Sequence, residues 1–370
     1  MRSRWTIRVP ILPDELFSSW LVRLALTHGC DPLVVTGQLW PRWRMWTQDP
    51  DRGLRADRLI SLTEASGIDA ARIQAAFLDH IVMKIAPGAI DTYATWPWVL
   101  ALGTRNRRRH GGLQYCPACL ADDQQPYFRR QWRMVWHTSC GVHQIGLLDR
   151  CCHCKGVIAP HLLCAEDTNL AVCAHCKTVL TDQRAHLLAR QIVEPDAVLF
   201  QSLAERVVNR GRGRYGSTFL PIEQWFVLAR YFITLVRKVS TTKSDGLRAL
   251  VEALGMQPQK MISPMTGLPL EMLPTVERAS LLGAAALFFK IGPRALFREV
   301  KAAQLTRATL CDRRIGYPAC LESLFASLPN PIRYHHRISP TQPFKPKSDV
   351  VVMRKWARLQ RKLLTKAGRV

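Results

Sequence analysis

Four pairs of metal-binding side chains lie between residues 115 and 177, and two residues separate the members of each pair. The pairs are Cys116/Cys119, Cys140/His143, Cys151/Cys154 and Cys173/Cys176. One tight turn can present both donors of such a pair to a single ion, and two pairs complete a tetrahedral zinc site. The sequence therefore predicts two Zn²⁺ ions, one bound by three cysteines and a histidine and the other by four cysteines.

Both ions are expected to be structural, because a catalytic zinc keeps one coordination position open for water and here all eight positions are filled. Disulfides are the competing use of paired cysteines. The first residues do not read as a secretory leader, since Arg8 and Pro10 interrupt the apolar stretch that follows Arg2 and Arg4. Reduced thiolates bound to metal are the favoured interpretation.

Five cysteines remain outside this assignment. Cys152 lies inside the third pair and could replace Cys151 as a ligand, although Cys152 and Cys154 are separated by one residue, a spacing that fits poorly. The others have no close-spaced partner and are expected to be small buried apolar side chains. These are Cys30, Cys164, Cys311 and Cys320.

The charge of the chain indicates a polyanionic partner. Its 52 Lys and Arg residues stand against 28 Asp and Glu residues, which gives a net charge of +24, and such an excess is most often a sign of nucleic-acid binding. No uninterrupted apolar run approaches the roughly 18 residues that a membrane span needs. We therefore expect a soluble, intracellular protein without a membrane partner.

Basic side chains gather in several segments, and these are the candidate nucleic-acid contacts. The first segment precedes the first cysteine pair, and the second lies in the connection that follows that pair. The candidates are Arg105, Arg107, Arg108, Arg109, Arg129, Arg130, Arg133, Arg210, Arg212, Arg214, Arg307, Arg313, Arg314, Lys345, Lys347, Arg354 and Lys355.

Aromatic residues accompany the second basic segment, namely Tyr127, Phe128, Trp132 and Trp136. Alternating basic and aromatic side chains can follow phosphates and stack on bases. The alternative is that the aromatic rings pack the small core around the metal while the arginines are solvated or pair with carboxylates. The sequence leaves both interpretations open.

We expect a mainly α-helical protein with four parts. Residues 1–104 form a helical domain that resembles a helix-turn-helix, residues 105–182 a tandem zinc-finger module, and residues 183–330 a helical region with a second such motif. Residues 331–370 hold 11 Lys and Arg residues and one acid, and are expected to be a basic tail. Two or three folded domains suit 370 residues.

The first helix-turn-helix is expected where Leu59–Ser66 and Ala70–Leu78 flank a glycine turn, with Asp69 as the N-cap of the second helix. Arg72 would lie on the first turns of that helix, the part that enters a major groove. Any packed helical hairpin shows the same pattern, so the signal is generic.

The second motif is expected near the end of the folded region. An apolar helix over Thr275–Lys290 precedes two shorter helices over Pro293–Ala303 and Thr306–Arg313. Arg307 and Thr309 would lie on the exposed face of the last helix, where DNA readers carry their contacts.

The segment from Leu12 to Leu24, with the sequence LPDELFSSWLVRL, resembles the TniQ family, which includes TnsD. The resemblance continues through Tyr115–Cys119 and through Asp122–Trp136, which leads to Cys140 and His143. Trp43–Arg52, with Trp46, Asp49 and Asp51, is also typical of the family. The agreement is specific over about residues 10–30 and 113–180 and loose elsewhere.

This resemblance implies a target-selection adaptor of bacterial transposons rather than an enzyme. Such proteins mark the insertion site by binding DNA directly or by binding an RNA-guided Cascade complex, and they recruit an AAA+ ATPase regulator (TnsC/TniB-like). The RNA-guided branch also implies a head-to-tail homodimer. This chain is shorter than the long TnsD proteins, which weakens the expectation of autonomous site recognition, whereas its basic tail favours it.

Two other classes compete with the adaptor. A zinc-containing transcription regulator has the same composition, and promoter binding in isolation would favour it. A metal-dependent nuclease needs carboxylates or histidines beyond the structural ligands, for which the candidates are Asp122, Asp123, His137 and His153. The chain has no Walker A glycine loop, so it is not expected to be the ATPase itself.

Overall fold

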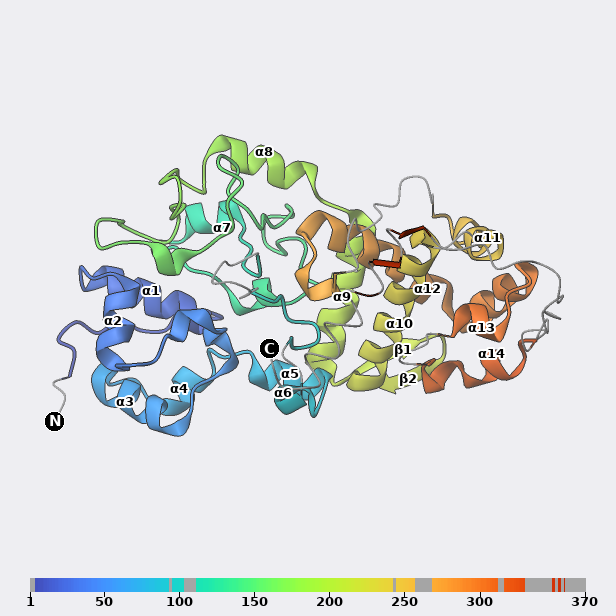
Figure 1. Cartoon of the computed structure of the whole chain (residues 1–370), viewed down its shortest axis with the longest axis horizontal. Helices are drawn as coiled ribbons and strands as arrows, with labels where there is room; N and C mark the ends of the chain where they lie inside the picture. Colours follow the sequence, from blue (N-terminus) through green and yellow to red (C-terminus); the bar gives the residue numbers. More distant parts are fainter. Residues whose placement is uncertain are drawn as a thin grey trace. The chain divides into compact units, whose positions relative to one another are not determined.

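The computed structural model describes residues 4–92, 95–102, 111–241, 244–256, 268–311 and 316–329, together with residues 348–349, 352–353 and 356 (Figure 1). Helices dominate the described part of the chain, which confirms the mainly α-helical prediction. Backbone contacts divide the chain into Met1–Asn330 and Pro331–Val370, and the elements described next all belong to the first unit. The finer domain boundaries within it remain a prediction.

The N-terminal helices are built around α1, which is buried from Phe17 to Ala25 because it lies between two apolar cores. Phe17 and Trp20 face the core of the N-terminal helices. Leu16 and Val22 face the larger core, which continues through residues 111–182, the segment that contains the cysteine pairs and is called the metal-binding segment below. The elements of this part are α1 (Phe17–Thr27), α2 (Pro32–Leu39), η1 (Met45–Thr47), η2 (Pro50–Arg52), α3 (Ala56–Ser66), α4 (Ala70–Gln74), α5 (Asp79–Ile85) and α6 (Ala89–Thr92).

The helical hairpin α3–α4 has the predicted turn but a shorter second helix. Gly67 adopts a left-handed conformation (φ +69°), and the Asp69 carboxylate accepts a hydrogen bond from the backbone N–H of Ala71, as an N-cap does. The expected helix to Leu78 ends at Gln74, because Phe77 packs edge-on against Phe17 and the N–H of Leu78 donates to Asp51 instead of to its own helix. Tertiary contacts therefore override local helix propensity here.

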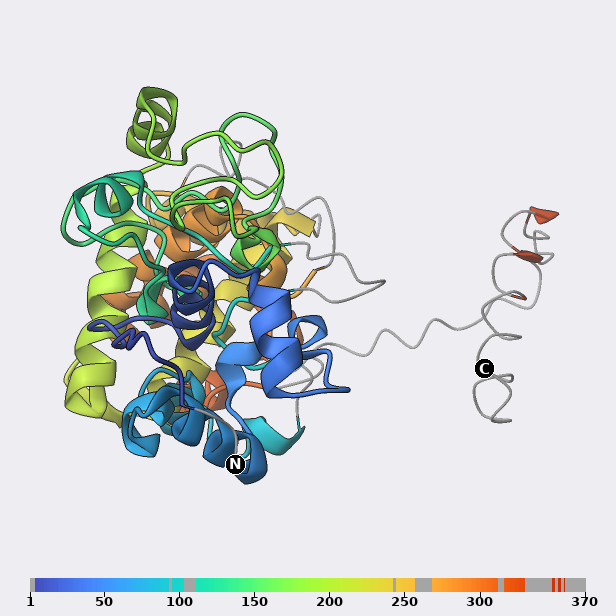
Figure 2. The ribbon, with the colours of Figure 1, turned by 90° about the vertical axis from the view of Figure 1, so that its left-hand side faces the viewer.

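The C-terminal half of the unit is a packed group of helices in which α12 contacts both α9 and α10 (Figures 1 and 2). A hairpin of two antiparallel strands joins α9 to α10. The elements are α8 (Gln183–Gln191), α9 (Pro195–Arg210), β1 (Arg212–Tyr215), β2 (Thr218–Pro221), α10 (Ile222–Thr241), α11 (Asp245–Ala253), η7 (Leu270–Met272), α12 (Thr275–Ala302), α13 (Arg307–Leu310), η8 (Ala319–Leu321) and α14 (Glu322–Ala326).

Helix α12 is interrupted at Gly292, whose backbone (φ +73°) is not helical and which precedes Pro293, so the expected break between two helices is confirmed. By length and composition α12 is apolar enough to cross a membrane. It nevertheless packs into the core, where Leu282, Ala285 and Phe288 are fully buried. In this unit α12 is a core helix.

Helix α13 is shorter than the predicted Thr306–Arg313. Thr306 caps its start by accepting from the N–H of Thr309. At the other end the carbonyls that would continue the helix accept hydrogen bonds from side chains of α10, since the Tyr231 hydroxyl donates to Leu310 (3.1 Å) and Lys238 donates to Thr309. The second helix of this motif is a single turn, and Arg313 and Arg314 lie outside the described residues.

Arg278 of α12 connects the metal-binding segment to this group of helices through hydrogen bonds. Its guanidinium is fully buried and donates to the Val135 carbonyl (2.6 Å) and to the Gln114 side chain (2.7 Å). Burial lowers the pKa of Arg278 to about 10, and the surrounding carbonyl oxygens compensate for the lost water. The metal-binding segment and the C-terminal helices therefore share one core.

Candidate metal centres

The first cluster brings together Cys116, Cys119, Cys140 and His143, whose donor atoms all lie within 4.8 Å of one another. The Sγ atoms of Cys119 and Cys140 are 3.5 Å apart, and the Nδ1 atom of His143 lies 3.3 to 3.6 Å from the three sulfurs. A tetrahedron with zinc–sulfur bonds of about 2.3 Å and a zinc–nitrogen bond of about 2.0 Å has edges of about 3.5 to 3.8 Å. The donors fit a tetrahedral ion.

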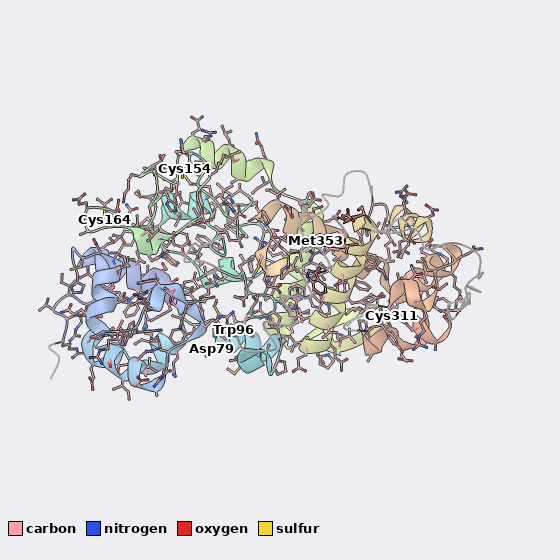
Figure 3. All side chains as sticks on the ribbon, viewed as in Figure 1. Asp79, Trp96, Cys154, Cys164, Cys311 and Met353 are labelled. Atoms are coloured by element: carbon pink, nitrogen blue, oxygen red, sulfur yellow. The ribbon has the colours of Figure 1, made fainter. Side chains whose placement is uncertain are left out.

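The second cluster contains four sulfurs. The Sγ atoms of Cys151 and Cys176 are 3.7 Å apart, as are those of Cys154 and Cys173. A disulfide holds its sulfurs at about 2.05 Å, so these cysteines are free thiols arranged around a common centre. Cys151 and Cys173 are buried whereas Cys154 lies at the surface, near α8 in Figure 3.

Three of the four pairs sit on the same backbone turn. In each turn the N–H of the first ligand donates to the carbonyl five residues later, and the N–H four residues later donates back to the first ligand. The residue after the second ligand is left-handed in all three cases, at Gln144 (φ +55°), Lys155 (φ +59°) and Lys177 (φ +60°). This turn aims both donors of a pair in one direction. The two-residue spacing in the sequence was sufficient to predict that both donors of a pair face the same ion.

The remaining pair lies at the start of α7 (Pro117–Asp122). Cys116 is the N-cap, and its sulfur accepts from the N–H of Cys119 at 3.4 Å. Pro117 at the first helical position has no N–H to leave unpaired, which favours a helix start there. Backbone N–H donors next to sulfur also stabilise a thiolate.

Asp122 orients the histidine ligand of the first cluster. The Nδ1 atom of His143 faces the sulfurs, and its Nε2 atom lies 2.8 Å from a carboxylate oxygen of Asp122. A carboxylate on the outer nitrogen fixes the ring and its tautomer in metal sites. Asp122, which the sequence suggested as a hydrolytic candidate, thus has a supporting contact to His143, and its neighbour Asp123 pairs with Arg129 at 2.7 Å.

The other hydrolytic candidates, His137 and His153, also contact carboxylates of the protein. His137 is buried next to Glu205, and burial lowers the pKa of His137 to about 3, so the ring is neutral near pH 7. His153 and Cys152 both contact Asp182, the N-cap of α8. Cys152 therefore points away from the four-sulfur cluster, in which Cys151 takes the ligand position.

The aromatic rings of the second basic segment form the core around the first cluster. Phe128, Trp132 and Trp136 are each at most 2 % exposed, whereas Tyr127 is half-buried. The core interpretation of these three rings is therefore confirmed.

Arg133 corrects one expectation, because it cannot contact nucleic acid in this fold. Its side chain is completely buried and binds Asp49 and Asp51, each at 2.6 Å, and the Leu100 carbonyl at 2.8 Å. A buried arginine needs such partners to replace water. The sequence did not predict this cluster, although Asp49 and Asp51 lie in the segment Trp43–Arg52 that is typical of the family.

Its neighbours in the chain are also paired. Arg129 binds Asp123, and Arg130 binds Asp14 at 3.1 Å. Both side chains are less than a quarter exposed. Their first role is to hold the metal-binding segment against its surroundings.

The remaining basic candidates differ in their surroundings. Arg210, Arg212 and Arg214 are exposed at and after the end of α9, and Arg307 donates to the Tyr317 hydroxyl at 2.9 Å. The others lie outside the described residues. These are Arg105, Arg107, Arg108, Arg109, Arg313, Arg314, Lys345, Lys347, Arg354 and Lys355.

The four isolated cysteines are half-buried rather than buried, which corrects the expectation for them. Cys164 lies 3.2 Å from an oxygen of Asp167, which also binds Lys177, so a polar contact replaces apolar packing there. Cys164 and Cys311 lie far apart within the unit (Figure 3).

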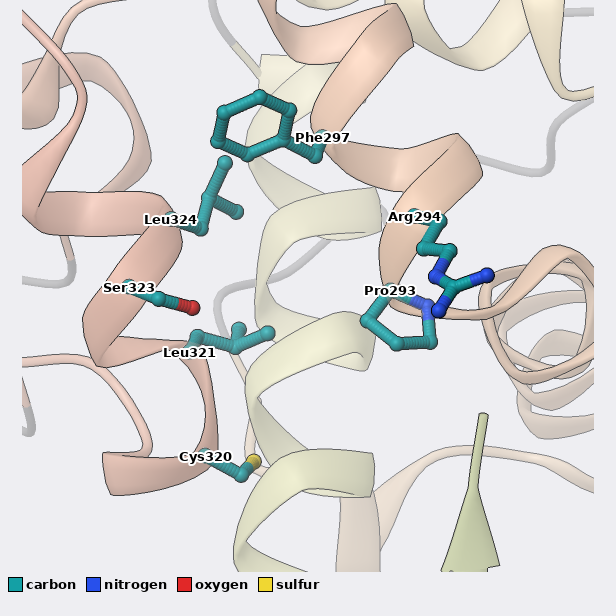
Figure 4. Close-up of a pocket in the computed structure, with 7 residues that line it drawn as sticks. All are labelled: Pro293, Arg294, Phe297, Cys320, Leu321, Ser323 and Leu324. Atoms are coloured by element: carbon teal, nitrogen blue, oxygen red, sulfur yellow. The ribbon is translucent and has the colours of Figure 1, made fainter. Parts of the chain in front are cut away.

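A surface hollow of about 290 Å³ lies between the end of α12 and α14 (Figure 4). Its wall is largely apolar, with Phe297, Leu321 and Leu324 facing the hollow beside Arg294. Among the described residues that line it, none carries a carboxylate or an imidazole, the groups that hydrolytic chemistry needs.

The fold and these clusters define a mainly helical protein with two Cys/His clusters, each of which brings together four donor atoms that could hold one metal ion. Residues 6–147 match the model of the TniQ family, so the chain carries a TniQ domain over these residues. The match includes all four ligands of the first cluster and ends before the second. No curated protein matches the chain.

Proposed function

We propose that this chain is a non-enzymatic adaptor that selects the target site for DNA transposition. It binds target DNA, or an RNA-guided complex already bound to DNA, and recruits an AAA+ ATPase regulator of the transposase. The observation that carries this proposal is the TniQ match over residues 6–147. The work required of such a protein is binding free energy, and no bond needs to be broken.

The metal in both clusters is Zn²⁺ with a structural role. Sulfur-rich tetrahedral donor sets with four protein ligands favour zinc and leave no position for a reacting water. Cys116, Cys119, Cys140 and His143 hold one ion, and Cys151, Cys154, Cys173 and Cys176 hold the other. Each ion crosslinks segments that contain little regular secondary structure of their own.

Contact with DNA is mainly electrostatic. The net charge of +24 supports binding to phosphates, and the affinity then falls steeply as salt is added. Among the described residues the exposed Arg210, Arg212 and Arg214 are the first candidates. The basic tail, with Lys345, Lys347, Arg354 and Lys355, adds further phosphate contacts. The adaptor then acts in the cytoplasm, on the nucleoid.

The test has two arms. The purified chain is mixed with duplex DNA over a range of salt concentrations, alone and against competitor, and the same experiment is repeated without residues 350–370. We expect the truncated chain to bind all sequences more weakly and with a shallower salt dependence. Equal affinity and slope would remove the tail from the proposal.

The second arm concerns the protein partners. The chain is co-purified with the AAA+ regulator of the same transposon, with and without DNA, and its own mass in solution is measured to detect a homodimer. Stable association with the regulator supports the adaptor. If the chain does not bind the AAA+ ATPase but binds a promoter and controls transcription from it, the chain is instead a transcription regulator.

A further inference from the structure

The β1–β2 hairpin presents a basic and aromatic outer face. Side chains alternate along β1, so that Gly213 and Tyr215 are buried while Arg212 and Arg214 are exposed. On the partner strand Phe219 stands opposite Arg214 and is 60 % exposed. The Arg212 guanidinium lies 5.0 Å from the centre of the Phe219 ring. The three side chains form one outward surface.

The inner face of the hairpin is seated tightly on the helices. A Cβ atom added at Gly213 would lie 2.3 Å from Trp225 of α10, and one added at Gly216 (φ +61°) would lie 2.6 Å from Pro293 of α12. Tyr215 packs against Phe289, with ring centres 5.8 Å apart. These contacts fill the space beneath the inner face, and the Phe219 ring lies on the opposite, exposed face.

Residues 206–222 carry only positive charges, between Glu205 and Glu223. The stretch 206–222 holds four arginines, Arg206, Arg210, Arg212 and Arg214, and no acidic residue, and the next acid is the exposed Glu223. Within the described part of the chain none of these four arginines pairs with a carboxylate. Arg129, Arg130 and Arg133 are all paired with carboxylates, whereas Arg214 donates to the Gly216 carbonyl (2.6 Å) and Arg212 lies over the Phe219 ring.

We propose that the β1–β2 hairpin is a DNA-binding wing. Arg212 and Arg214 contact phosphates, and Phe219 packs against sugars and base edges in the groove between them. A two-stranded ribbon fits a DNA groove, and apolar side chains at such positions wedge against base steps. Arginine is suited to phosphate because its planar donors form paired hydrogen bonds. This inference rests on the proposed function.

The experiment compares three variants of the full chain with the wild type in duplex-DNA binding between 50 and 200 mM salt. The first is R212A/R214A, the second is F219A, and the control is R298A. Arg298 is 75 % exposed and pairs with the neighbouring Glu299, so its replacement removes a surface charge that is not part of the hairpin. Thermal unfolding of each variant checks that the fold is retained.

We expect R212A/R214A to reduce the slope of log affinity against log salt by about 1.8, since each phosphate contact contributes about 0.9. F219A carries no charge change, so it lowers affinity by about tenfold at an unchanged slope, the scale of one aromatic contact to a nucleotide. R298A leaves affinity and slope close to those of the wild type.

Each other outcome overturns a defined statement. A wild-type chain that does not bind DNA at 50 mM salt removes direct DNA contact from the proposed function, and the wing with it. A wild type that binds while the hairpin variants match R298A removes the wing alone. Hairpin variants that bind DNA normally but lose the AAA+ regulator reassign this face to a protein partner.

Discussion

The Arg133 guanidinium lies 2.6 Å from a carboxylate oxygen of Asp51, and neither side chain is exposed to solvent. Asp51 also accepts hydrogen bonds from the backbone N–H and the hydroxyl of Ser18, and Asp49 binds the other side of the guanidinium. This ion pair joins the start of α1, the η2 turn and the metal-binding segment. Three separate stretches of the TniQ domain thus meet at one buried charge cluster.

Replacing Arg133 with alanine is expected to destabilise the protein by about 3–5 kcal/mol, because it leaves the fully buried Asp51 without its cation, whereas Asp49 keeps Arg52. Chemical denaturation measures the change in the free energy of unfolding. The exposed Arg298→Ala serves as the matched control, with a change of less than about 0.5 kcal/mol. A loss below about 1 kcal/mol in Arg133→Ala would show that the cluster does not hold the domain together.

Asp122→Asn is expected to weaken metal binding at the first cluster by about 10- to 100-fold, since the His143 ring loses its charged outer partner. The chain contains its own control, because the second cluster has no histidine ligand. Cobalt titration distinguishes a centre with three sulfurs and one nitrogen from one with four sulfurs. Equal weakening of both centres would point to a general loss of folding instead.

His137 predicts a specific pH dependence of stability. Its pKa is lowered from 6.5 to about 3 by burial, so between these values the unfolded chain binds a proton that the folded chain does not. Stability is therefore lost as the pH falls below 6.5, with a slope that approaches about 1.4 kcal/mol per pH unit.

The variant His137→Gln lacks the titrating group and keeps a polar side chain beside Glu205. Its free energy of unfolding, measured from pH 7.5 to 5.5, is expected to fall less steeply than that of the wild type. Parallel curves for the two proteins would mean that the ring takes up a proton in the folded chain as readily as in the unfolded chain.

Cys173→Ser is expected to remove one zinc ion and unfold the segment around the second cluster, since each thiolate lost weakens the centre. Cys164→Ser, a cysteine outside both clusters, leaves the zinc content unchanged. Zinc content and thermal unfolding are measured on both variants. Retention of two ions by Cys173→Ser would contradict the ligand assignment.

The metal clusters were predictable from sequence because each pair is local. Two residues separate the donors of every pair, and the direction of the donors is set by one turn type in three pairs and by the start of α7 in the fourth. The α3–α4 turn was predictable for the same reason, because Gly67 adopts the left-handed conformation and Asp69 caps the following helix. These features depend on contacts within a few residues.

The burial of Arg133 in an ion pair could not be predicted from neighbouring residues. Its partners precede it by 82 and 84 residues, and nothing in the local pattern of arginines and aromatic rings separates a buried ion pair from a phosphate contact. The early end of α4 has a similar cause, since the N–H of Leu78 bonds Asp51, which lies outside the helical hairpin. Long-range partners decide both cases.

The most direct test of the account is the metal content of the intact chain, measured by native mass spectrometry together with elemental analysis. Two closed four-donor centres predict two zinc ions per chain, both lost together with folding when a strong chelator is added. Fewer than two ions per chain, or an ion that binds exchangeable water and turns over a substrate, would contradict it.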